Sequence, residues 1–311
     1  MPNYSGVWRL AQQMQAVAAG NWAFPTGTVA IFALGYAPCR STTRDKYTYA
    51  GCVVSSGTAA SAASGSGSAA GNSTVGIFAL GLTSGASTTR DKYTYGGCVV
   101  SSGAAASAAS YAGSAAGNAT VGIFALGYAS GVVATRNRYT YSGNTSASAT
   151  AAIFASFHGS ATGNSTVGIF ALGQIYCLSF VTNRDKYTYS NCTNTTATAA
   201  RCASAYGSAT GNSTVGIFAL GYTSCVSNLR DKYTYAGCVV SAGTAASVAS
   251  SGGSAAGNST VGIFALGGTP CRVATRNKYT YSGDVNGSAT AASVASASGS
   301  AASNGTCGVN I

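Results

Sequence analysis

The chain has 311 residues, of which only 7% are charged, and a formal net charge of +11. Low charge and 42 glycines could indicate disorder, but 19 Tyr and 10 Phe at fixed spacing argue against it, because disordered chains are poor in aromatic residues. No apolar run approaches the roughly 20 residues that a membrane-spanning helix needs. We therefore expect an ordered β protein without a membrane span.

Residues 1–27 differ from the rest of the chain and contain both tryptophans, Trp8 and Trp22. They lack the basic segment followed by an apolar segment that marks a signal peptide, so we expect synthesis and folding in the cytoplasm of the producing cell. We interpret 1–27 as an N-terminal adaptor or ring-closing segment and 28–311 as one domain of repeats.

The repeats are marked by the sequence Ile-Phe-Ala-Leu-Gly. Six copies begin at Ile31, Ile77, Ile123, Ile169, Ile217 and Ile263. All but one step are 46 residues; the fourth repeat is two residues longer. A seventh, degraded copy closes the chain at 304–311. Such a period indicates a solenoid or a propeller.

Each repeat has four parts, seen best in the second. A small-residue stretch ends in Gly71-Asn72, which suits a tight hairpin turn. The apolar run 74–81 predicts a strand covered on both faces, the alternating run 90–95 predicts a half-exposed strand, and 97–103 predicts an outer strand.

Four short strands per repeat with hairpin turns predict an all-β fold, a β-propeller rather than a β-solenoid. Counting 306–311 as a seventh apolar strand predicts seven blades, with the N-terminal segment around Tyr4 to Leu10 supplying the missing outer strands. Six blades with free ends is the alternative.

The repeat resembles the kelch repeat, and more closely the kelch-like repeat proteins of bacteriophage, especially cyanophage, tail genes. The resemblance rests on Gly71 to Phe78 with Asp91 to Tyr95, and on Gly211 to Phe218 with Asp231 to Tyr235; it covers roughly 24–311. Kelch repeats carry a Gly-Gly pair and an outer-strand Trp, whereas here a single Gly81 ends the apolar strand and no repeat has a Trp. The resemblance implies a kelch-like propeller in a phage virion.

Twelve of the 16 basic residues lie in six Arg-Asp/Asn-Lys/Arg triplets, such as Arg44-Asp45-Lys46 and Arg276-Asn277-Lys278. We interpret them first as groups that solvate an outer strand and protect its free edge. The second interpretation is a field that attracts an acidic polymer, such as an anionic host-surface polysaccharide. Charges spread evenly around a ring do not form the continuous basic stripe typical of nucleic-acid sites, so no nucleic acid is expected.

Residues able to do chemistry are scarce. His158 is the one histidine, and four of the five aspartates recur at equivalent repeat positions, whereas a catalytic residue is needed once. We expect no enzyme, no cofactor and no metal site, since Cys-x-x-Cys spacing is absent. The ten cysteines show no pairing pattern and are interpreted as free, with Cys192–Cys202 left open. The Asn-x-Ser/Thr sequences at Asn72, Asn164 and Asn258 are explained by turn chemistry.

Two windows vary between otherwise similar repeats: the residues after the strand-ending Gly, and those before the small-residue strand. In an antiparallel blade both windows emerge at the same end, so we expect a recognition face there; drift in unconstrained loops is the alternative. The candidate contacts are Tyr36, Arg40, Tyr111, Tyr128, Phe157, His158, Tyr176, Tyr206, Tyr222 and Arg272. Their aromatic rings suit stacking on sugars.

These features together predict a non-enzymatic virion protein, a tail fibre, tail tip or baseplate-associated adhesin that binds host-surface glycan. Its partners would be other tail or baseplate proteins and, as a second candidate, an anionic polysaccharide. A purely structural virion component of the tail or capsid is the alternative function, and a cellular adhesin or lectin is the third.

Overall fold

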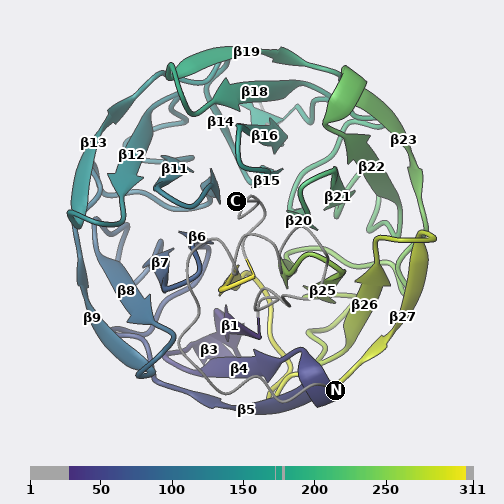
Figure 1. The fold of residues 1–311 in the computed structure, drawn as a ribbon, viewed down its shortest axis with the longest axis horizontal. Coiled ribbons are helices and arrows are strands. Elements are labelled where there is room, and N and C mark those ends of the chain that lie inside the picture. The colour runs from purple at the N-terminus through teal and green to yellow at the C-terminus, as the bar shows by residue number, and fades with distance from the viewer. Residues whose placement is uncertain (1–27, 172, 177–178, 306–311) are drawn as a thin grey trace, which may run out of the picture.

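The computed structural model describes residues 28–171, 173–176 and 179–305. These residues form a six-bladed β-propeller, in which six four-stranded antiparallel sheets surround one axis (Figure 1). The prediction of an all-β propeller is therefore confirmed, with six blades as in the alternative count. From the axis outward, blades 1 to 3 consist of β28 (Ser300–Ser303), β1 (Val29–Ala33), β4 (Arg44–Thr48) and β5 (Val53–Gly57); β6 (Ser68–Gly71), β7 (Val75–Ala79), β8 (Arg90–Thr94) and β9 (Val99–Gly103); and β10 (Ser114–Gly117), β11 (Val121–Ala125), β12 (Arg136–Thr140) and β13 (Thr145–Ala149).

Blades 4 to 6 follow the same order from the axis outward. They consist of β15 (Ser160–Gly163), β16 (Val167–Ala171), β18 (Arg184–Thr188) and β19 (Thr193–Ala197); β20 (Ser208–Gly211), β21 (Val215–Ala219), β22 (Arg230–Thr234) and β23 (Val239–Gly243); and β24 (Ser254–Gly257), β25 (Val261–Ala265), β26 (Arg276–Thr280) and β27 (Val285–Ala289). Short hairpin strands and single 3-10 turns complete the secondary structure: β2 (Tyr36–Ala37), β3 (Cys39–Arg40), β14 (Ser156–Phe157), β17 (Gln174–Ile175), η1 (Ala50–Cys52) and η3 (Ala236–Cys238).

The prediction of seven blades closed by the N-terminal segment is wrong. The last small-residue stretch forms β28, which pairs with β1 and completes blade 1 as its innermost strand. The first blade begins at its second strand, and the small-residue stretch that precedes the degraded copy supplies the missing inner strand. Residues 1–27, to which the ring-closing strands were assigned, and 306–311, to which the seventh apolar strand was assigned, lie outside the described residues.

The contact between β28 and β1 has the geometry of the internal hairpin turns, although these two strands are not consecutive in the chain. In blade 2, Asn72 Oδ1 accepts hydrogen bonds from the backbone amides of Thr74 and Val75, both at 2.9 Å. In blade 1, Asn304 Oδ1 accepts from the amide of Val29 at 2.9 Å, although the two residues are 275 positions apart. The Asn304 side chain therefore joins the first strand of the propeller to the last by the same contact that shapes each internal turn.

Small residues form the innermost strands because these strands crowd around the axis. Each inner strand contacts its neighbours in the adjacent blades, and together they line an axial channel with Ala, Gly, Thr and Ser side chains. The second strands supply the core between blades. Ile77 and Phe78 are 0% and 1% exposed, and the equivalent residues of every blade are buried in the same way.

The third strand of each blade is more buried than predicted. In β8, Arg90, Asp91 and Tyr93 are each at most 1% exposed, and only Lys92 and Thr94 are half-buried. The half-exposed pattern was expected for a strand near the rim, but the neighbouring blades cover both of its faces. The outermost strands carry the exposed residues instead.

The arginines of the basic triplets lie in the interior, which corrects both interpretations offered for them. Successive side chains of a strand point to opposite faces, so Arg44 reaches the next blade while Asp45 faces the preceding one. Arg44 donates to Asp91 at 2.8 Å, and Arg276 donates to Asp45 at 2.8 Å across the closing junction. Equivalent contacts at the other four junctions are Arg90–Asn137, Arg136–Asp185, Arg184–Asp231 and Arg230–Asn277.

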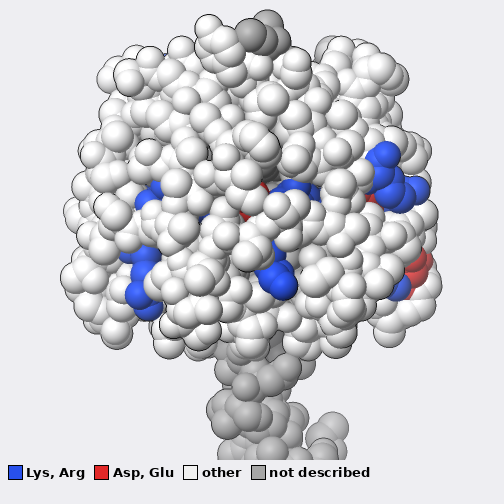
Figure 2. All heavy atoms as spheres, turned by 90° about the horizontal axis from the view of Figure 1, so that it is seen from above, with Lys and Arg blue, Asp and Glu red and all other residues white. Residues whose placement is uncertain are grey.

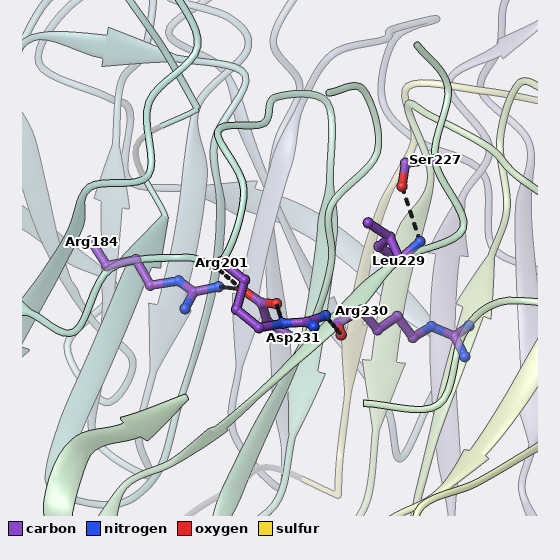
Figure 3. Close-up of polar contacts among 6 residues, drawn as sticks. All are labelled: Arg184, Arg201, Ser227, Leu229, Arg230 and Asp231. Atoms are coloured by element: carbon purple, nitrogen blue, oxygen red, sulfur yellow. Dashed lines mark hydrogen bonds and ion pairs between the residues drawn. The ribbon is translucent and has the colours of Figure 1, made fainter. Parts of the chain in front are cut away.

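We call this closed circle of side chains the girdle. Each girdle arginine also stacks on the Phe of the next blade, as Arg44 does on Phe78 at 4.6 Å from the ring centroid. Figure 3 shows Arg184 and Arg201 converging on Asp231 while Arg230 extends away toward the next blade. The girdle uses most of the chain's acidic groups as structural partners, so only the third residue of each triplet is left half-buried near the rim.

Candidate binding face

The two variable windows lie together at one end of the propeller. The window before each inner strand pairs with the window after the strand-ending Gly of the same blade. Gly65 and Leu82 exchange backbone hydrogen bonds at 3.0 and 2.8 Å, and Tyr111 and Tyr128 exchange two at 2.9 Å. We call this end the variable face; the Gly-Asn turns lie at the opposite end of the strands.

A closed ring of six backbone hydrogen bonds braces the variable face around the axis. The amide of each member donates to the carbonyl of the preceding blade's member at 2.6 to 2.9 Å. All six members have positive φ, from 53° to 65°. They are Ser66, Ala112, His158, Tyr206, Gly252 and Ser298. Because the backbone alone makes this ring, its side chains are free to differ between blades.

The ring explains why each apolar strand ends in Gly. Gly81 has φ +73°, and a Cβ there would lie 2.5 Å from the carbonyl oxygen of Ser66. Both the conformation and the close approach require a residue without a side chain. The constant Gly thus supports the place where the sequence begins to vary.

Five of the candidate residues form one continuous aromatic cluster on the variable face. Ring centroids lie 5.2 Å apart for Tyr111–Tyr128, 6.0 Å for Tyr128–Phe157, 4.7 Å for Phe157–His158 and 3.9 Å for His158–Tyr206. The members come from consecutive blades and are half-buried, except Tyr206, which is 36% exposed. We call these five residues the aromatic cluster.

Burial in this cluster perturbs two ionisable groups. Desolvation lowers the pKa of His158 to about 4, so the imidazole is neutral near pH 7. Burial also raises the pKa of Tyr206, with a smaller contribution from Tyr111. The cluster therefore presents an uncharged aromatic surface at neutral pH, suited to stacking on the apolar face of a ring.

The remaining candidates lie outside this cluster. Tyr222 is 37% exposed and packs edge-on against Phe180 at 5.7 Å, and Tyr176 is 81% exposed. Tyr36, Arg40 and Arg272 form a separate group between blades 6 and 1. Sequence reasoning missed Phe180, which lies in the longer hairpin of the fourth repeat; the two extra residues there were the available signal.

Cysteines occupy two distinct settings. Cys52, Cys98, Cys192 and Cys238 have positive φ at the turn before the outer strand, where Asn144 and Asp284 occur in the other two blades. Cys39, Cys225 and Cys271 are exposed in hairpins of the variable face. The eight cysteines within the described residues are all free, including Cys192 and Cys202.

Two other features are absent from the described residues. They contain no group of three or more His, Cys or Asp side chains placed to hold a metal ion. They also contain no helix long and apolar enough to cross a membrane.

The turn asparagines make structural contacts between blades. Asn72 Nδ2, for example, donates to the carbonyl of Ala119 in the next blade at 3.0 Å.

Comparison with known proteins defines the fold alone. No protein-family model matches the chain, and no curated protein matches it significantly. Among solved structures, the one titled "Structure of YjhT" is similar, with a TM-score of 0.61 over 76% of this chain and 87% of that chain, at 11% identity. At this identity, the similarity supports the propeller architecture.

Proposed function

We propose that this protein is a non-enzymatic phage virion protein, a tail fibre, tail tip or baseplate-associated adhesin that binds host-surface glycan through its variable face. The aromatic cluster carries the proposal. Its rings lie in the segments that differ between repeats, on a backbone that is nearly the same in every blade. A rigid scaffold with variable contact residues is typical of recognition proteins.

The distribution of charge supports a binding role over a catalytic one. Four of the five aspartates are at most 1% exposed and accept hydrogen bonds from girdle arginines. The fifth, Asp284, accepts from the amide of Thr244 in the preceding blade. The single histidine is neutral and stacked on Tyr206. These groups are held as structural partners rather than poised for proton transfer.

The opposite end favours docking to other proteins. Val53, Val99, Val239 and Val285 begin four of the six outer strands there, each 54% to 56% exposed. These exposed apolar side chains of four neighbouring blades fit attachment to a neighbouring tail or baseplate protein. It also keeps open the second candidate function, a structural virion component whose faces are both covered.

Binding of the purified protein to host envelope polysaccharide tests the adhesin. Tyr111→Ala and Tyr206→Ala should each weaken binding about tenfold, because stacking and ring burial are lost. Val99→Ala is the control, since Val99 is 55% exposed but begins the outer strand β9, outside the variable windows. An equal loss in the control, or no binding by the folded wild-type protein at low salt, would overturn the proposal. Burial of Tyr111 and Tyr206 against another virion protein in the assembled particle would establish the structural role instead.

A further inference from the structure

Two arginines from neighbouring blades converge on one tyrosine of the variable face. Arg40 lies in the hairpin of blade 1 and Arg272 in that of blade 6, and their guanidinium carbons lie 5.7 and 5.9 Å from the centroid of the Tyr36 ring. Arg40 Nε donates to Tyr36 Oη at 3.2 Å. Arg272 Nη1 donates to the carbonyl of Pro38 at 3.1 Å. These contacts hold two like charges near each other.

The pair has no carboxylate to neutralise it within the described part of the chain. The chain contains no Glu, and all five aspartates have other partners: four accept from girdle arginines, and Asp284 accepts from the amide of Thr244. Arg40 and Arg272 are exposed, and their contacts leave several N–H donors facing solvent. This differs from the girdle, where each buried arginine has a fixed acceptor. Figure 2 shows how sparse such basic groups are on the visible surface.

Only two neighbouring blades, 1 and 6, carry an arginine in the hairpin of the variable face. Pro38-Cys39-Arg40 and Pro270-Cys271-Arg272 are the same tripeptide in the hairpins of blades 1 and 6, and the corresponding hairpins of the other four blades carry no basic residue. Gly65 makes room for the Tyr36 ring, because a Cβ on Gly65 would lie 2.4 Å from it. The ring therefore packs closely against the backbone at Gly65.

We propose that Arg40, Arg272 and Tyr36 form an anion subsite for an acidic saccharide, in which the guanidinium groups bind a carboxylate or phosphate and Tyr36 packs against the attached sugar. Guanidinium forks match the paired oxygens of both groups, and charge-assisted hydrogen bonds are the strong ones. The subsite rests on the proposed glycan-binding function. It predicts that the ligand carries a negative charge, whereas the uncharged aromatic cluster would bind a neutral sugar equally well.

Calorimetric titration with an oligogalacturonate tests the subsite, with its methyl ester as the uncharged analogue. The wild-type protein should bind the acid at least about tenfold more tightly than the ester, and added salt should reduce the difference. The double variant Arg40→Gln/Arg272→Gln should bind both probes equally. Lys232→Ala is the matched control, because it removes a positive charge from the side wall and should keep the preference for the acid. A glucose 1-phosphate arm shows whether phosphate replaces carboxylate.

Titration with inorganic phosphate separates this subsite from the glycan proposal. If no saccharide binds but phosphate binds the wild-type protein at least about tenfold more tightly than the double variant, the subsite stands and the glycan function falls. If saccharides bind with no preference for the acid, or if Lys232→Ala loses the preference as fully as the double variant, the subsite is overturned. The Tyr206→Ala variant should keep the preference at lower overall affinity.

Discussion

The hydrogen-bond partners of the buried girdle arginines differ between junctions, and exchanging two of these arrangements by mutation tests how the girdle is stabilised. Arg90 and Arg230 donate to an asparagine, Asn137 or Asn277, instead of an aspartate. Each of these two arginines also donates to a polar residue on the outer strand of the same neighbouring blade: Arg90 to Ser146 at 2.9 Å and Arg230 to Asn286 at 2.8 Å. Ser146 and Asn286 are the residues that pair with Tyr139 and Tyr279 in the sheet. Where the acceptor is Asp91, the corresponding residue is Val100. We therefore expect Asp91→Asn and Val100→Ser to compensate each other.

The expected magnitudes follow from the contacts of Arg44. Removing one partner of a buried ion pair costs about 3–5 kcal/mol, but an asparagine keeps one acceptor, so Asp91→Asn should cost about 2 kcal/mol. Val100→Ser alone should cost about 1–2 kcal/mol through lost apolar burial. In the double variant the serine hydroxyl accepts from Arg44, and a hydrogen bond to a charged group contributes about 1.5–3 kcal/mol. The double variant should therefore be no less stable than Asp91→Asn alone.

Urea unfolding of the wild type, both single variants and the double variant gives the coupling free energy directly. We expect a favourable coupling of about 1–2 kcal/mol. Val54→Ser provides the matched control, because Val54 holds the same position in blade 1, and its cost should simply add to that of Asp91→Asn. Strict additivity of Asp91→Asn and Val100→Ser would refute the reasoning.

Two further predictions concern the variable face. Gly81→Ala should lower the free energy of unfolding by about 2 kcal/mol, because of its positive φ and the approach of the Ser66 carbonyl; Gly85→Ala, where a Cβ meets nothing within 4 Å, should change it little, and equal urea midpoints for the two variants would contradict the ring's role. His158 is protonated in the unfolded chain below its ordinary pKa near 6.5, but in the folded protein only below about 4, because burial lowers its pKa. Stability should therefore fall as pH drops from about 6.5 to 4, by about 2 kcal/mol after allowing for partial exposure of the ring. The difference in urea midpoint between wild type and His158→Gln, followed over this range, measures the effect; a difference that does not change with pH would exclude it.

The repeat and its four strands were readable from sequence because the signals are local. The apolar run 74–81, the Gly-Asn turn and the alternating run 90–95 each specify an element within a few residues, and the structure has strands within both runs and a hairpin turn at Asn72. The blade count was misjudged because it depends on which strand pairs with β1. That partner, β28, lies at the other end of the chain, so no local pattern identifies it.

The candidate contacts were chosen because they vary between repeats, and variation gives no information about distance. The sequence placed all the candidate residues on one face, but the direct contact of five of them in the aromatic cluster depends on the pairing of windows within each blade and on the ring of hydrogen bonds across blades. The convergence of Arg40 and Arg272 required closure of the ring between blades 6 and 1, since the two residues are remote in sequence.

By itself the sequence determined an all-β repeat with a constant scaffold and two variable windows, because strand periodicity and turn residues act over short range. Only the tertiary structure decided where the charges go. The Arg-Asp dipeptide is the same local pattern whether its strand faces water or is covered on both sides, and the covering comes from blades some 46 residues away in either direction. Closure of the ring buries these charges as inter-blade pairs and leaves two unneutralised arginines on the variable face.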